Sequence, residues 1–258
     1  MAEEKRQFPT EVIDLPSKGY FYSSDNPLSS GQVEIKYMTA KEEDILTSQN
    51  LIQKGIVLDK LLNALIVTEG VNLDDILVGD KNAIMLAARV LAYGKEYSFE
   101  FTDETSARKR TYTVDLTSFG DKKVDFSKCE KGKNEFEFEL PTSKRKLTFK
   151  LLTQADDKKI EEEIKAMKKF TKESGIDPEI TTRLKASVLS VDGSRDRKTI
   201  NEFIDNEFLS RDSLAYRKNL TSITPDVDMT TYVDMDDGTD KEMTVPVTVQ
   251  FFWPSPDW

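Results

Sequence analysis

The sequence predicts an α+β fold built from two lobes that repeat one plan. Three observations predict it: segments in which apolar and polar residues alternate, segments with helical periodicity, and two similar strand-to-helix junctions at Thr39 and Thr153. We expect an extended N-terminal arm at residues 1–30, one lobe at residues 31–140 and a second at residues 141–258. Each lobe should comprise a strand, a group of capped helices and an antiparallel hairpin.

The first lobe begins with a strand pattern. The arm before it holds three prolines and no sustained periodicity, so we expect it to be extended. Residues 33–38 alternate between apolar and polar types, and Thr39 opens a capping box that begins a helix. Two more helical stripes follow, and the last should end at Gly94. Residues 97–101 and 112–116 alternate cleanly, which predicts a hairpin.

The second lobe follows the same order. Residues 147–151 read as a strand, and Thr153 opens another capping box. Three helical stretches come next, each with apolar residues on one side. The Asp237-Gly238 dipeptide is a strong turn signal, and it predicts a closing hairpin in which Pro246 places the last strand at an edge.

Composition excludes several kinds of chemistry. The 258-residue chain has no histidine and one cysteine, Cys129. Without histidine there can be no Ser-His-Asp or Cys-His nucleophile, and nearly all catalytic zinc sites are excluded. The glycines do not have the spacing of dinucleotide-binding or P-loop motifs. A lone cysteine forms no internal disulfide, which fits a reducing compartment. We therefore expect a binding protein and not an enzyme.

Charge argues against nucleic acid as a partner. The net charge is −10, and residues 220–258 contain eight acids and one base. A nucleic-acid binder needs a positive surface that displaces counterions, whereas an acidic terminus suits a basic protein surface. The N-terminus lacks the pattern of a signal peptide, and no apolar stretch approaches the roughly 18 residues of a membrane span. We expect no membrane partner.

Carboxylates are the remaining catalytic candidates. A carboxylate-based hydrolase stays an alternative, and it would need two carboxylates about 5 to 9 Å apart in a cleft. Most acids alternate with lysines, as in residues 156–159, which is typical of a solvated helix. The aspartates at residues 234–240 do not fit a calcium loop, because Val233 and Met235 would occupy its first and third ligand positions. We expect no metal or cofactor.

The C-terminus is aromatic and rich in proline. Residues 251–258 carry Phe251, Phe252, Trp253 and Trp258, which together could bury a large apolar area. The acceptor could be the chain's own core or another protein. If it is another protein, a chain without residues 253–258 should fold but lose its partner.

Five short segments carry a resemblance to a known family. They are residues 15–22, 33–46, 79–84 with Ala88-Arg89 and Tyr93-Gly94, 245–247 and 251–254, and the stretch Arg211-Asp212-Ser213 accompanies them. Together they resemble the baseplate hub subunit and tail assembly chaperone family of T4-like contractile-tailed bacteriophages. The segments are spread over most of the chain, although each is short.

The resemblance implies a late phage protein that acts in the host cytoplasm. It would be a component of the baseplate hub needed for viral tail assembly, with other hub or tail proteins as partners and no catalytic residues. The alternative is a transient assembly chaperone that is absent from the virion, and a homo-oligomer is left open. Relatives often carry Cys-x-x-Cys in the terminal hairpin, where this chain has Asp234 to Gly238, so we expect no structural zinc.

Both ends of the chain are the expected contact regions. We expect a partner to bind there and not on the helical middle. The expected contact residues are Leu15, Pro16, Lys18, Gly19, Tyr20, Tyr22, Phe251, Phe252, Trp253, Pro254 and Trp258.

Overall fold

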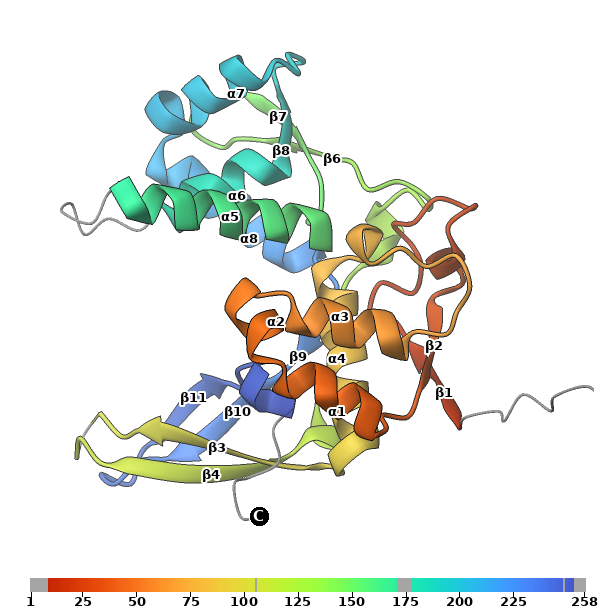
Figure 1. Ribbon diagram of the computed structural model, residues 1–258. Helices are drawn as coiled ribbons and strands as arrows, with labels where there is room; N and C mark the ends of the chain where they lie inside the picture. The colour runs from red at the N-terminus through yellow and green to blue at the C-terminus, as the bar shows by residue number, and fades with distance from the viewer. Residues whose placement is uncertain (1–8, 105, 171–177, 248, 253–258) are drawn as a thin grey trace, which may run out of the picture.

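The computed structural model describes residues 9–104, 106–170, 178–247 and 249–252. It has the expected α+β class, with helices and small antiparallel sheets gathered in two lobes (Figure 1). We name them lobe 1, residues 9–135 and 225–252, and lobe 2, residues 136–224. Each lobe contains a hydrophobic core of its own. None of the helices in the described part of the chain has the length and apolar character that a bilayer span requires.

Lobe 1 consists of two paired strands, a group of helices and a hairpin. Its main elements are β1 (Thr10–Asp14), β2 (Gln32–Lys36), α1 (Ala40–Thr47), α2 (Gln49–Lys54), α3 (Val57–Leu65), α4 (Val78–Tyr93), β3 (Glu96–Thr102) and β4 (Lys109–Asp115). Short elements connect them: η1 (Pro27–Ser30), η2 (Leu73–Asp75), η3 (Leu116–Ser118), β5 (Gly120–Asp121) and η4 (Phe126–Lys128).

Lobe 2 surrounds the three-stranded sheet β6-β7-β8 with helices. Its elements are β6 (Phe136–Glu139), β7 (Lys146–Phe149), α5 (Gln154–Phe170), α6 (Glu179–Ser187), β8 (Val188–Val191), α7 (Arg197–Glu202), the π-helical turn η5 (Phe203–Glu207) and α8 (Ser210–Ile223). The chain then returns to lobe 1 through β9 (Val227–Asp228), β10 (Thr230–Asp234), β11 (Asp240–Thr244) and η6 (Val249–Phe252).

The terminal hairpin belongs to lobe 1, and this changes the expected domain boundaries. Val233, Met235 and Val245 are buried in the first core and not in the second, although the expected second lobe extended over residues 141–258. In Figure 1, β10 and β11 lie beside β3 and β4, far from the sheet of lobe 2. The alternation of the strand showed which side chains are buried, but alternation carries no information about the lobe that buries them.

The two strand-to-helix junctions are built alike. The Glu42 carboxylate accepts hydrogen bonds from the Thr39 amide at 3.0 Å and from Lys36 Nζ at 2.7 Å. The Asp156 carboxylate accepts from the Thr153 amide at 3.1 Å and from Lys150 Nζ at 2.7 Å. In each case the last residues of a strand supply the lysine and the third residue of a helix supplies the acid. Both threonines thus lie at the start of their helices as expected. Each belongs to a unit of three residues in which the acid also binds a lysine from the end of the preceding strand.

A second pair of equivalent contacts fixes the first strand of each lobe. β1 runs into Leu15-Pro16-Ser17, and the buried Asp80 of α4 accepts a hydrogen bond from the Ser17 amide at 2.9 Å. β6 runs into Leu140-Pro141-Thr142, and the buried Asp212 of α8 accepts from the Thr142 amide at 2.7 Å. Asp80 is the third residue of α4, and Asp212 is the third residue of α8. The two helices therefore correspond position by position.

The helices α3 and α6 also correspond. Both have nine residues, and the residue after each pairs antiparallel with a strand: Ile66 with Ile35 of β2, and Val188 with Phe149 of β7. The strand β8 continues this pairing to Val191, whereas lobe 1 has a single bridge. The two lobes therefore share one arrangement of strands and helices, called here the frame. It differs from the expected plan, because each copy begins with two strands and lobe 2 adds β8 and α7.

The N-terminal arm is part of the first copy. β1 pairs with β2 along its whole length, from Thr10 opposite Lys36 to Asp14 opposite Gln32. The segment between them turns back into the core, where Phe21 and Leu28 are buried. The sequence could not show this, because a strand of five residues and an irregular loop leave no sustained periodicity.

Glu42 gives the fold a dependence on pH. Burial alone would raise the pKa of this carboxyl, but the hydrogen bonds from Lys36 and Thr39 outweigh burial and hold the pKa at about 2, below its ordinary value of 4.5. A lowered pKa in the folded state adds stability above pH 4.5, and this stability is lost as the pH falls toward 2.

We expect Glu42→Gln to lower the free energy of unfolding at neutral pH by about 1–3 kcal/mol, because the amide cannot replace the charge-assisted bonds. The variant should also lose less stability than the wild type between pH 4.5 and about 2. Urea denaturation at several pH values measures both effects. Asp44→Asn, an exposed position on the same helix, is the control. An unchanged pH profile in Glu42→Gln would contradict the assignment.

Candidate functional site

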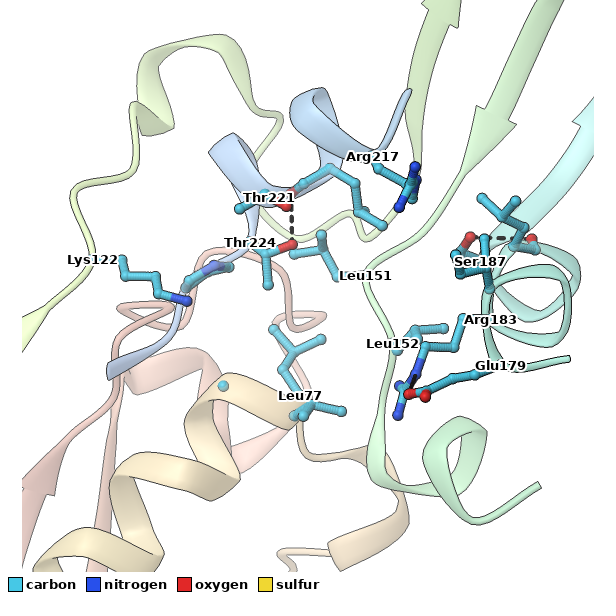
Figure 2. Close-up of a pocket in the computed structure, with 16 residues that line it drawn as sticks. Leu77, Lys122, Leu151, Leu152, Glu179, Arg183, Ser187, Arg217, Thr221 and Thr224 are labelled. Atoms are coloured by element: carbon cyan, nitrogen blue, oxygen red, sulfur yellow. Dashed lines mark hydrogen bonds and ion pairs between the residues drawn. The ribbon is translucent and has the colours of Figure 1, made fainter. Parts of the chain in front are cut away.

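An open hollow lies between the two lobes and is called here the interlobe groove. It has a volume of about 490 Å³ and is lined by α6, α8, the start of α4 and the segment before α5. Leu77, Leu151 and Leu152 form its floor (Figure 2). One wall belongs to α6 and the other to α8, so two helix faces and an apolar floor enclose the space.

The α6 wall mixes apolar and charged side chains. Glu179, Ile180, Arg183, Leu184 and Ser187 follow one another at the spacing of a single helix face. Leu184 and Ser187 are buried, but 53% of Ile180 is exposed. A large aliphatic side chain with half of its surface in water is a feature that a partner could cover.

The α8 wall is more polar. Arg217, Leu220, Thr221 and Thr224 face the groove from successive turns. Leu214 stands one turn before Arg217 on the same face and is 47% exposed. The wall therefore offers an exposed leucine, a cation and hydroxyl groups along one line of the helix.

Cations dominate the charge of the groove. The lining residues include Lys122, Arg183 and Arg217 but only one acid, Glu179. Arg183 is held by Glu179 and Asp157, each at 3.1 Å. Within the described residues, Arg217 forms neither a hydrogen bond nor an ion pair. Lys122 is paired with Asp226 at 3.4 Å, so Arg217 is the lining cation that would gain a partner from a carboxylate.

Two contacts fix the surroundings of the groove. Lys158 of α5 joins lobe 2 to lobe 1, because it pairs with Asp59 at 3.0 Å and with Asp74 at 2.7 Å. The Gly79 position of α4 lies against Pro225, where the chain returns to lobe 1 after α8, and a side chain there would stand 1.9 Å from the Pro225 carbonyl oxygen. Only glycine allows this close approach.

The groove can bind but has little means of catalysis. Its lining holds one carboxylate, Glu179, which is ion-paired with Arg183, and one lysine, Lys122, which is ion-paired with Asp226. Across the described parts of the chain, no cluster of three or more histidine, cysteine, aspartate or glutamate residues is arranged to hold a metal ion. The arrangement is suited to contact with another macromolecule.

A second hollow of about 460 Å³ runs beside α4 and β1. Its floor is apolar, and Glu11, Asp14 and Asp121 line it. Burial raises the pKa of Asp121 above its ordinary value, nearby Lys18 opposes this, and the charge of Asp14 adds to it. This is the place where the described structure brings acidic side chains together beside an apolar surface.

The first expected contact segment is mostly core. Leu15, Pro16, Gly19 and Tyr22 are buried, so their side chains are not available to a partner in this structure. Tyr22 donates a hydrogen bond to Asp80 at 2.6 Å and accepts one from the Leu77 amide at 2.9 Å. Burial keeps the pKa of Tyr22 far above its ordinary value, so its hydroxyl stays protonated and can donate.

The remaining members of that segment lie at the surface. Lys18 is exposed and Tyr20 is partly exposed. Tyr20 packs against Phe126, and the Lys18 ammonium lies 5.8 Å from the centre of the same ring. These two side chains pack against a neighbouring loop, and they stay available for contact.

The second expected contact segment is anchored in lobe 1. Phe251 and Phe252 are fully buried, and the Phe251 carbonyl accepts a hydrogen bond from Arg89 Nε at 2.8 Å. Arg89 also donates to the carbonyls of Gly94 and Glu96, each at 3.2 Å. The two phenylalanines therefore dock on the chain's own core. Trp253, Pro254 and Trp258 lie outside the described residues.

Sequence reasoning missed the interlobe groove. Its lining comes from segments far apart in the chain, and α6 by itself resembles an ordinary solvated helix. The one local signal was Ile180, an aliphatic residue one turn before Leu184 on the same helix face. A comparison of α6 with α3 would have strengthened that signal, but the register between them became known only from the structure.

The comparisons with known proteins gave no relatives. No protein-family model, no curated protein and no solved structure matches the chain.

The docking of the C-terminus gives a testable expectation. Phe252→Ala should lower the free energy of unfolding by about 3–5 kcal/mol, because the ring is fully buried and its removal leaves a cavity. Leu214→Ala, at a position 47% exposed, should change it by less than about 0.5 kcal/mol. Urea denaturation compares the two.

The same experiment extends to a chain that ends at Phe252, which keeps both buried rings. We expect this chain to unfold at the wild-type denaturant concentration. A loss of stability as large as that of Phe252→Ala would show that residues 253–258 also belong to the core.

Proposed function

We propose that this chain is a component of the baseplate hub of a contractile bacteriophage tail and acts by binding other tail proteins without catalysis. The observation that carries the binding role is the interlobe groove, an apolar hollow with cationic rims and a half-exposed Ile180. Large apolar side chains left in water beside a hollow are typical of surfaces that another protein covers. The proposal places the protein in the host cytoplasm during assembly.

The resemblance in the five short segments supports the choice of family. Two of these segments contact the same helix: residues 15–22 contact α4 through Asp80, and residues 251–252 contact α4 through Arg89. Motifs that are separate in sequence but joined in one packing unit are expected when they describe a common fold. The proposal of a hub protein rests on that resemblance, and the proposal of protein binding rests on the groove.

A transient assembly chaperone is the second form of the same function. A permanent subunit should bury an interface well above 1,000 Å² and remain in the particle, whereas a chaperone binds reversibly and leaves. The narrow groove alone suits either form.

Deletion of the gene from the phage genome that encodes it should prevent tail assembly, because an essential hub contact would be lost. Electron microscopy of the lysates should show particles without finished baseplates, and a plasmid copy should restore them. Normal yields of infectious phage would contradict the proposal. Mass spectrometry of purified virions then separates a subunit, which is present in stoichiometric amount, from a chaperone, which is absent.

One observation favours a carboxylate-based cell-wall hydrolase as another candidate. Asp14 and Asp121 line the second hollow together, and the raised pKa of Asp121 is a property that a general acid needs. Against it, Asp14 already accepts a hydrogen bond from Gln32 at 2.9 Å, and most of the lining is apolar.

We expect the purified chain to leave a suspension of bacterial cell walls unchanged in turbidity, because the binding role needs no bond cleavage. Asp121→Asn should behave in the same way. Clearing by the wild type that is abolished in Asp121→Asn would replace the binding proposal with the hydrolase.

A further inference from the structure

Lobe 1 shows how the repeated frame closes the space between its third and fourth helices. Val57, Leu61 and Leu65 of α3 are 2%, 0% and 1% exposed, and α3 packs directly on α4. Met85 and Ala88 of α4 are buried on the facing side. In lobe 1 this frame therefore buries the Val57, Leu61 and Leu65 face of α3 in the same apolar core as Met85 and Ala88 of α4.

The corresponding face of α6 is different. Because α3 and α6 have the same length and the same pairing at their ends, Val57, Leu61 and Leu65 correspond to Glu179, Arg183 and Ser187. All three positions that close lobe 1 are polar in lobe 2, and all three line the groove.

The α8 wall differs from the equivalent helix α4 of lobe 1 in the same way. Since Asp80 and Asp212 are equivalent, Met85 and Arg89 correspond to Arg217 and Thr221. Two buried positions have become exposed ones that line the groove. Below the groove α6 and α8 still meet in the core of lobe 2, where Leu184 and Tyr216 are buried in one cluster and the hydroxyls of Ser187 and Tyr216 are hydrogen-bonded at 2.9 Å. The groove is thus a specific departure from the frame and not a packing defect of the fold.

The departure leaves both apolar and charged groups without partners. Ile180 stands 53% exposed on one wall, and Arg217 lacks any hydrogen bond or ion pair to the residues that the structure describes. Lys122 pairs with Asp226 at 3.4 Å and Arg183 pairs with Glu179 and Asp157, so Arg217 is the lining cation that has no partner among the described residues. An occupant that covers Ile180 and pairs with Arg217 must combine aliphatic side chains with a carboxylate.

We propose that the interlobe groove binds an amphipathic helix of a partner protein whose aliphatic stripe is flanked by carboxylates. The inference rests on the proposed protein-binding function and names the chemistry of the partner. A helix fits because the walls are helix faces, and the α6 wall spans about 12 Å at 1.5 Å per residue, or roughly two turns of a docked helix. The stripe covers Ile180 and the leucine floor, and a carboxylate pairs with Arg217.

The test uses a pair of synthetic helical peptides with the full chain. The acidic peptide carries a leucine stripe flanked by glutamates, and its basic twin has lysine in place of every glutamate. We expect fluorescence anisotropy to show binding of the acidic peptide, weaker binding as salt is added, and no binding of the basic twin.

Charge reversal at Arg217 separates a groove contact from general attraction. Arg217→Glu should weaken binding of the acidic peptide about tenfold, the effect of losing one charge-assisted hydrogen bond, and should favour the basic twin. Lys218→Glu is the matched control: it makes the same charge change at the next, exposed residue of α8, which does not line the groove. Equal losses in Arg217→Glu and Lys218→Glu would overturn the proposal.

An apolar pair of variants tests the other half of the surface. Ile180→Asp should abolish binding, whereas Val12→Asp, at a position 55% exposed on β1, should leave it unchanged. Circular dichroism confirms that both variants are folded. A wild-type dimer that dissociates in Ile180→Asp would also overturn the proposal, because the groove would then hold a second copy of the chain.

The peptide-binding test and the gene-deletion test of the proposed function can succeed or fail independently. If the acidic peptide fails to bind but deletion of the gene still stops tail assembly, the partner chemistry is wrong and the hub role stands. If the peptide binds as expected but the phage assembles normally without the gene, the groove chemistry stands and the hub role is wrong.

Discussion

A buried aspartate in the first turn of a helix fixes the first strand of each lobe. Asp80 and Asp212 accept backbone hydrogen bonds from the turns that follow β1 and β6, and each is fully buried. A buried carboxylate is tolerated only when donors surround it, so each turn must keep the shape that points its amides inward. The leucine before each turn, Leu15 or Leu140, is then placed in the core. Strand, turn and helix are specified together.

The same frame is used for two purposes. In lobe 1, α3 and α4 meet over Val57, Leu61 and Leu65, and the terminal hairpin adds further apolar surface to a continuous core. In lobe 2, the equivalent positions of α6 are polar and line the interlobe groove. Stability can therefore be concentrated in lobe 1 and in the aspartate contacts, while the interlobe groove is free to carry exposed apolar groups. This division allows a binding surface without the loss of a well-packed core.

The ends of the chain act as structural ties. The segment at residues 15–22 and Phe251 both contact α4, the first through Asp80 and the second through Arg89. Among the described residues Arg89 has no carboxylate partner. Its guanidinium donates to three backbone carbonyls, and burial lowers its pKa. Tyr93 and Tyr97 lie within 5.2 and 5.8 Å of the guanidinium and add their ring faces. One helix thus joins segments from both termini.

The sequence alone determined the α+β class, the capping boxes at Thr39 and Thr153, the hairpins and the turn at Asp237-Gly238, because alternation, helical spacing and turn residues act over a few positions. Only the tertiary structure decided that the terminal hairpin returns to lobe 1 and that the arm joins the core of this lobe. Periodicity indicates which face of an element is buried, but it does not indicate which other element packs against that face. The interlobe groove is also a feature that only the tertiary structure decided. Ile180 and Arg217 are ordinary surface residues in sequence, and they form one site only because the lobes place α6 opposite α8.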